Sequence, residues 1–184
     1  IDGWGVGIVP GSDITIRDAP AVTVSAIIGL PWENQTVTLE DLARKTYSEA
    51  TWNIVDATLR FFNVTTYGWE IGAFANNNTV IIKNSDFTGP TLNSDHSKYI
   101  IENSTMNLVQ GHEFVEMTIT DSVVIGDVIA KENSTITLIN TEVRGDGDAF
   151  GNVIATDNGS IVLRNSTYSG ELRETENGSV TEVK

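Results

Sequence analysis

Eight asparagines stand in the triplet Asn-x-Ser/Thr, the acceptor pattern for N-linked glycans, and none of these triplets has Pro in the middle. Attachment of a glycan to the asparagine side-chain nitrogen is therefore the chemistry that the residue spacing suggests most often. The number of triplets exceeds what chance predicts for 184 residues, which favours a secreted or surface-exposed glycoprotein. The candidate acceptors are Asn34, Asn63, Asn77, Asn103, Asn133, Asn158, Asn165 and Asn177.

One acidic segment is similar to a calcium-binding loop in its spacing. Asp146, Asp148 and Asn152 place oxygen-bearing side chains close together in the sequence. Calcium loops alternate such ligands with other residues, but Phe150 stands where the next ligand after Asp148 is expected. These three residues are candidates for a weak Ca²⁺ site, and a solvated polar loop is the alternative. No other cofactor is expected.

The outward face of the predicted strands carries only two carboxylates, Glu40 and Glu102. They lie three repeats apart, or ~14 Å at the ~4.8 Å spacing of paired strands, whereas glycosidases place two carboxyl groups ~5–9.5 Å apart. A second polar cluster consists of Asp95, His96, Lys98 and His112. Asp95 and His96 fall in the column of the asparagines of the preceding repeat, which favours an exposed corner, and His112 is interpreted as a loop residue. We therefore expect no catalytic residues and no enzyme activity.

The element that positions all these residues is a five-residue phrase of apolar, variable, apolar and variable positions that closes on Asn or Asp. Its closing positions are separated by 23, 22, 21, 19, 18, 19, 25 and 19 residues, and the last copy is degenerate. A period near 20 is typical of a solenoid, and the alternation predicts that its walls are strands. The copies are 14–18, 37–41, 59–63, 80–84, 99–103, 117–121, 136–140, 161–165 and 180–184.

The phrase predicts a strand with two inward side chains, followed by a sharp corner. Asn and Asp tolerate the left-handed backbone of such a corner, and in five repeats a Gly follows five residues later, where we expect a second corner. Opposite charges meet on neighbouring repeats at Arg17/Glu40 and at Lys83/Glu102, which suits parallel, in-register stacking. The inward pairs are 14/16, 37/39, 59/61, 80/82, 99/101, 117/119, 136/138 and 161/163.

This repeat also offers a structural explanation for the glycosylation triplets. Corners favour Asn and strand starts favour Thr or Ser, so the repeat alone would generate Asn-x-Ser/Thr. The acceptors fall into two columns: Asn34, Asn77, Asn133, Asn158 and Asn177 precede the strand, and Asn63, Asn103 and Asn165 follow it. The pre-strand column holds the better acceptors if its corner faces solvent, because asparagines stacked inward as a ladder would not be accessible.

The whole chain, 1–184, is predicted to be one all-β domain: a single-stranded right-handed parallel β-helix, or β-solenoid, of about eight to nine rungs. Its last rung, 173–184, is polar, with Arg173 and Glu174 at positions that are apolar elsewhere. At the other end, residues 3–8 are similar to residues 68–73, so the sequence begins inside a rung. We expect this uncapped end to continue into a longer chain or to be covered by another chain.

With this repeat the chain resembles the right-handed parallel β-helix proteins, the pectin-lyase-like solenoids, and among them the surface-protein and carbohydrate-binding repeats. The resemblance covers essentially the whole chain and implies the fold, because this fold carries lyases, hydrolases, adhesins and inert scaffolds. Hydrolases of the family use clustered aspartates, a Gly-His-Gly and an Arg-x-Lys. This chain has Gly111-His112-Glu113, and it has neither an Asp-Asp pair nor an Arg-x-Lys.

Charge narrows the possible partners. The chain has 25 acidic and 11 basic residues and no cysteine, so its surface repels nucleic acid and anionic lipid. No apolar stretch reaches the ~18 residues of a membrane span. We expect a non-catalytic structural or adhesive solenoid of an extracellular cell surface, which associates with itself, with other surface proteins or with glycans. The alternative is a carbohydrate-active β-helix protein, either a polysaccharide lyase or hydrolase or a glycan binder.

Overall fold

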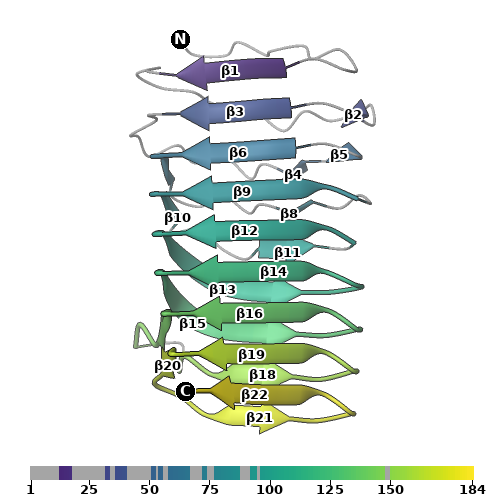
Figure 1. The fold of residues 1–184 in the computed structure, drawn as a ribbon, viewed down its shortest axis with the longest axis vertical. Coiled ribbons are helices and arrows are strands. Elements are labelled where there is room, and N and C mark those ends of the chain that lie inside the picture. The colour runs from purple at the N-terminus through teal and green to yellow at the C-terminus, as the bar shows by residue number, and fades with distance from the viewer. Residues whose placement is uncertain are drawn as a thin grey trace.

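The strands stack as the coils of a solenoid in the computed structural model, which describes residues 13–17, 32–33, 36–40, 51–52, 54–55, 58–66, 72–73, 77–87, 92–94, 96–147 and 150–184. Every element in these ranges is a β-strand, and every strand pair is parallel. The predicted all-β solenoid is therefore confirmed. Figure 1 shows the chain advancing along one axis, with β1 (Asp13–Arg17) and β22 (Ser179–Val183) at opposite ends of the stack.

One wall of the solenoid is a nine-stranded sheet in which sequence order and spatial order coincide. Each strand has five residues and pairs in register with the strand of the next turn, as in Ile136↔Ile161 and Leu138↔Leu163. These strands form the front wall in Figure 1. They are β1 (Asp13–Arg17), β3 (Thr36–Glu40), β6 (Thr58–Phe62), β9 (Thr79–Lys83), β12 (Lys98–Glu102), β14 (Glu116–Thr120), β16 (Thr135–Ile139), β19 (Ser160–Arg164) and β22 (Ser179–Val183).

A second sheet of eleven strands supplies the remaining walls, and β2 (Trp32–Glu33) pairs with β5 (Ile54–Val55) beside it. Most of its strands are short, but in β13 and β15 the two short strands of a turn are continuous. The eleven strands are β4 (Thr51–Trp52), β7 (Thr65–Thr66), β8 (Gly72–Ala73), β10 (Asp86–Phe87), β11 (Leu92–Ser94), β13 (Thr105–Gly111), β15 (Val123–Ala130), β17 (Glu142–Arg144), β18 (Val153–Ala155), β20 (Thr167–Tyr168) and β21 (Leu172–Glu174).

The core is a column of apolar side chains between these walls. The inward pairs predicted for β6 to β19 are all buried, from Leu59 and Phe61 to Ile161 and Leu163. The opposite wall contributes further buried residues, and Phe61 meets Phe87 edge-to-face with ring centroids 5.4 Å apart. The inward side chains of β1 and β3 lie outside the described residues. Burial of this column is the main favourable term in folding.

The predicted charge pairs fit the observed register. Arg17 is in register with Glu40, and Lys83 is in register with Glu102. The Lys83 Nζ lies 2.8 Å from Glu102 Oε2, with both side chains partly exposed. Such exposed pairs are worth ~0–1 kcal/mol, so this pair favours the register without dominating stability.

The expectation of a glycine corner is wrong for two turns, because Gly145 and Gly170 do not have a positive φ. Gly126 has φ 110° and lies where the register between β13 and β15 shifts, as expected for an irregular backbone at this glycine. Gly170 is needed for a different reason: an added Cβ would lie 2.4 Å from Asn152 Oδ1. Gly68 and Gly89 lie outside the described residues.

The last turn has the polar character expected of residues 173–184. Arg173 and Glu174 are exposed, and Glu182 stands in register with the buried Leu163 without being buried itself. Burial and a hydrogen bond to Glu182 raise the pKa of Tyr168 in the adjacent turn. Within the described residues, the apolar core therefore ends at the buried Leu163 and the partly buried Val180, which packs against it.

Replacing Leu138 by Ala should lower the free energy of unfolding by about 2–5 kcal/mol, because the fully buried side chain would leave a cavity between Ile119 and Leu163. The matched control is Thr137→Ala, which alters the outward neighbour and should change stability by less than about 1 kcal/mol. Urea unfolding at 25 °C measures both. Equal losses in the two variants would contradict the assignment of the inward face.

Candidate functional site

Two polar corners run along the solenoid, one at each end of the strands of the nine-stranded sheet. The corner after the strand is a single residue with a left-handed backbone, with φ between 47° and 54° at the six positions Asn63, Asn84, Asn103, Asp121, Asn140 and Asn165. The backbone N–H of each donates to a carbonyl of the next turn, for example from Asn84 to Glu102 at 3.1 Å. Asn and Asp occupy this position because they tolerate this conformation better than other side chains do.

The asparagine side chains of this post-strand corner form a hydrogen-bonded ladder on the surface. Asn103 Nδ2 donates to Asn84 Oδ1 at 2.8 Å, and Asn165 Nδ2 donates to Asn140 Oδ1 at 2.9 Å. Asn140 Nδ2 donates in turn to Asp121 Oδ1 at 2.9 Å. In each case the donor lies on the later turn, so the ladder has a direction.

A second ladder lies beneath the first and was not foreseen from the sequence. The hydroxyls of Ser85, Ser104 and Ser122 each accept the backbone N–H of the residue at the same position in the preceding turn, at 3.1 Å. Each hydroxyl also donates to the carbonyl two residues before it, at 2.7–2.8 Å. The signal was present, because Ser or Thr directly follows the corner residue in five repeats. These buried hydroxyls satisfy backbone groups that the turn would otherwise leave unpaired.

The corner before the strand has two consecutive left-handed residues in four turns: Glu113/Phe114, Glu132/Asn133, Asp157/Asn158 and Glu176/Asn177. In the first three of these turns the second residue of the pair donates its backbone N–H to the carbonyl of the first residue of the next pair, for example Asn133 to Asp157 at 3.2 Å. This double corner was not predicted, although an acid followed by Asn recurs at the pre-strand position of four repeats.

All predicted glycan acceptors that the structure describes are exposed. Asn77, Asn133, Asn158 and Asn177 line the corner before the strand, and Asn63, Asn103 and Asn165 line the corner after it. Asn34 lies outside the described residues. The two columns differ in one chemical respect: the Nδ2 atoms of Asn103 and Asn165 are donors in the amide ladder.

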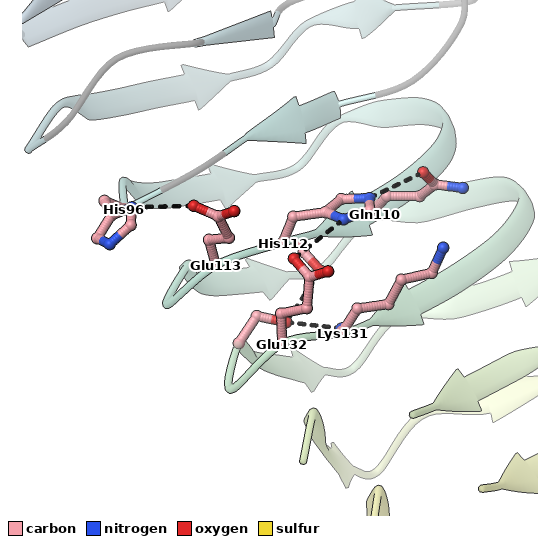
Figure 2. A network of polar contacts seen from close by, with 8 residues as sticks. His96, Gln110, His112, Glu113, Lys131 and Glu132 are labelled. Carbon is pink, nitrogen blue, oxygen red and sulfur yellow. Dashed lines mark hydrogen bonds and ion pairs between the residues drawn. The ribbon is translucent and has the colours of Figure 1, made fainter. Parts of the chain in front are cut away.

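Both histidines of the chain lie near the pre-strand corner, on neighbouring turns (Figure 2). His96 Nδ1 is 3.8 Å from Glu113 Oε2, and His112 Nδ1 is 3.8 Å from Glu132 Oε2. His112 Nε2 also lies 3.4 Å from Gln110 Oε1. Each histidine thus faces a carboxylate of the following turn. His96 and Lys98 are exposed, and Asp95 lies outside the described residues.

The proposed calcium residues do not all take the same role. Asp146 is exposed, and Asp148 lies outside the described residues. Asn152 is buried: its N–H donates to Asp127 Oδ1 at 2.8 Å, and its Oδ1 accepts the N–H of Glu171 at 2.8 Å. Asn152 therefore joins three turns of the solenoid, and the Ca²⁺ site at this loop stays a prediction. Within the described ranges, no group of three His, Cys, Asp or Glu side chains could hold a metal ion.

A polar cavity of about 300 Å³ opens beside the post-strand corner. Two acids line this cavity. Burial raises the pKa of the first, Asp86, and its Oδ1 is shielded from solvent without a hydrogen-bond partner. Asp121 is the second acid. The cavity is lined mainly by the oxygen-bearing side chains of Thr65, Asn84, Asp86, Asn103, Thr105 and Asp121.

Comparison of the chain with family models, with curated proteins and with solved structures found no match. None of the described residues belongs to a helix that could cross a membrane. The two corners and the cavity are therefore the features of the molecule that bear on its function.

One acidic residue of the pre-strand corner, Glu176, is expected to make stability depend on pH. A hydrogen bond and charge repulsion from Asp157, on the preceding turn, raise the pKa of the exposed Glu176. A carboxyl group whose pKa is raised by folding stabilises the folded state below its ordinary pKa, and this contribution is lost as the pH rises through the raised value. We expect Glu176→Gln to reduce the loss of thermal stability between pH 4 and pH 7, because the amide donates to Asp157 at every pH.

The control for this prediction is Glu142→Gln, which removes the same charge from an exposed residue of β17 outside the pre-strand corner. Melting temperatures of the wild type and both variants at pH 4 and pH 7 make the comparison. A pH dependence of Glu176→Gln identical to that of the wild type would contradict the raised pKa of Glu176 and its hydrogen bond with Asp157.

Proposed function

We propose that this chain is a non-catalytic structural or adhesive β-solenoid of an extracellular surface and that it carries N-linked glycans on its corners. The observation that supports this most directly is the exposure of the seven described acceptors, Asn63, Asn77, Asn103, Asn133, Asn158, Asn165 and Asn177. A glycan requires an accessible amide nitrogen, and the repeat could have stacked these side chains inward instead.

The pre-strand corner is the preferred glycan-bearing ridge. Asn133, Asn158 and Asn177 are exposed on three successive turns, which backbone hydrogen bonds join at this corner. At the ~4.8 Å spacing of paired strands, bulky glycans on neighbouring turns would crowd one another. We therefore expect partial occupancy along this ridge.

The post-strand corner is a poorer acceptor. A glycan replaces one hydrogen of the asparagine Nδ2, and in Asn103 and Asn165 this nitrogen already donates to the preceding turn. The added sugar must also fit beside a stacked amide. We expect lower occupancy at these two residues than at Asn133, Asn158 or Asn177.

The same proposal includes partners and family. The left-handed asparagine corner and the parallel coil support membership of the right-handed, pectin-lyase-like solenoids, in their surface-protein branch. Parallel, in-register stacking of strands is also the geometry by which further chains add to a sheet edge. Association with further copies, with other surface proteins or with glycans fits a repetitive acidic surface better than binding to nucleic acid does.

The second candidate function is that of a carbohydrate-active protein, and the polar cavity favours it. Carboxylates, carboxamides and hydroxyls are suitable partners for sugar hydroxyls. Asp86 and Asp121 lie two turns apart, which is about 10 Å along the axis and at the outer limit for a pair of glycosidase carboxylates. Binding of a glycan is therefore favoured over its cleavage within this second proposal.

Glycopeptide mapping and intact mass of the protein from its native source test the leading proposal. We expect glycans on the pre-strand asparagines, with higher occupancy at Asn133, Asn158 or Asn177 than at Asn103 and Asn165. Asn84 and Asn140 are internal controls, since they share the post-strand corner but lack the acceptor triplet. A bare polypeptide mass would remove the main support for a surface glycoprotein.

A further inference from the structure

The amide ladder of the post-strand corner is interrupted at Asp121. Asn140 shows the regular arrangement, because its Nδ2 donates to the preceding turn and its Oδ1 accepts from Asn165 on the following turn. Asn103 also donates its Nδ2 to the preceding turn, and the corner residue of the following turn is Asp121. A carboxylate has no N–H to offer, so Asp121 cannot donate to Asn103 Oδ1 as Asn165 donates to Asn140, and two acceptors are adjacent at this step.

One cation can contact oxygen atoms of both turns. Asn103 and Asp121 are on adjacent turns, since the Asn103 N–H donates to the Thr120 carbonyl at 3.0 Å. Side-chain atoms of adjacent turns approach to 2.8–2.9 Å elsewhere in this column. Ca²⁺ accepts six to eight oxygen ligands in flexible geometry, whereas Mg²⁺ demands near-ideal octahedral geometry and dehydrates reluctantly, so mixed side-chain oxygens on two turns suit Ca²⁺ better.

The polar cavity lies on the same step and provides further oxygen atoms. Thr105 follows Asn103 by two residues, and no Lys or Arg lines the cavity. Asp86 is in register with Thr105 and adds a second carboxylate. Its Oδ1 is buried without a hydrogen-bond partner, an observation independent of the ladder. Buried oxygens without a partner are rare in folded proteins and often indicate a bound ion or water.

We propose that this cavity is a calcium site in which the Asp121 carboxylate and Asn103 Oδ1 bind the ion between two turns. Thr105 and water complete the coordination, and Asp86 contributes its negative charge from the neighbouring turn. Two carboxylates in an open cavity correspond to the weak end of protein calcium sites, with a Kd of ~10⁻⁴–10⁻³ M. The site is separate from the loop at Asp146, and it does not depend on the proposed surface role.

Thermal unfolding in CaCl₂, with MgCl₂ and with NaCl at matched ionic strength, tests this site. We expect ~10 mM CaCl₂ to raise the melting temperature of the wild type by about 3–5 °C more than either other salt. Asp121→Asn should abolish this response. It should also raise the melting temperature without calcium by about 1–4 °C, because the new amide can donate to Asn103 and repair the ladder.

The variant is expected to fold, because Asn occupies this corner in five other described turns. Glu116→Gln is the matched control: it removes one charge from the other end of the same turn's strand and should leave the calcium response intact. Direct titration calorimetry with CaCl₂ should agree with the melting data. A calcium response that persists in Asp121→Asn, or that disappears in Asp146→Asn instead, would overturn the proposal. A wild type that responds equally to all three salts, so that the cavity holds only water, would overturn it as well.

Discussion

The parallel, in-register pairing of each turn with the next is the constraint on which the rest of this structure depends. Equivalent residues lie ~4.8 Å apart along the axis, so each side chain of the repeat stacks on the equivalent side chains of the turns before and after it. An apolar position therefore becomes a continuous core, as in the column from Leu59 to Leu163. A polar position becomes a ladder, and an acidic position becomes a row of like charges.

The polar side chains stacked at the two corners find their hydrogen-bond partners in different ways. Asparagine and serine both donate and accept hydrogen bonds, so columns of Asn103 and Ser104 types satisfy themselves from turn to turn. Carboxylates only accept, so a column of carboxylates needs donors from other residue types. In the pre-strand corner, histidines lie opposite Glu113 and Glu132, and a hydrogen bond with Asp157 raises the pKa of Glu176. At Asp121 the described residues contain no such partner in the preceding turn, which is the physical basis for the calcium proposal.

The sequence predicted the part of the fold that follows from period and alternation. The inward pairs, the left-handed asparagine corner and the Lys83–Glu102 pair all follow from stacking identical phrases. The glycine corner failed because a regular spacing does not reveal whether a Gly provides a positive φ or, like Gly170, only room for a neighbouring oxygen.

The candidate sites were less predictable for a related reason. The exposure of the glycan acceptors depends on which way each corner faces, and this is decided by the three-dimensional path of the turn. The serine ladder could have been read from Ser or Thr after each corner, but its partners are backbone atoms about 20 residues away. The cavity at Asp121 arises from an exception to the repeat, so periodicity alone could not indicate its chemistry.

The most direct test of turn-to-turn stacking is amide hydrogen exchange followed residue by residue by NMR. The amides of Val64, Ser85, Ser104 and Thr141 donate to hydroxyls of the next turn and lie outside the strands. If the ladders and the sheets form one cooperative unit, these four amides exchange as slowly as those at the centres of β14 and β16. Exchange of the four at the rate of unprotected amides, while the strands stay protected, would contradict the central role of the stacked corners.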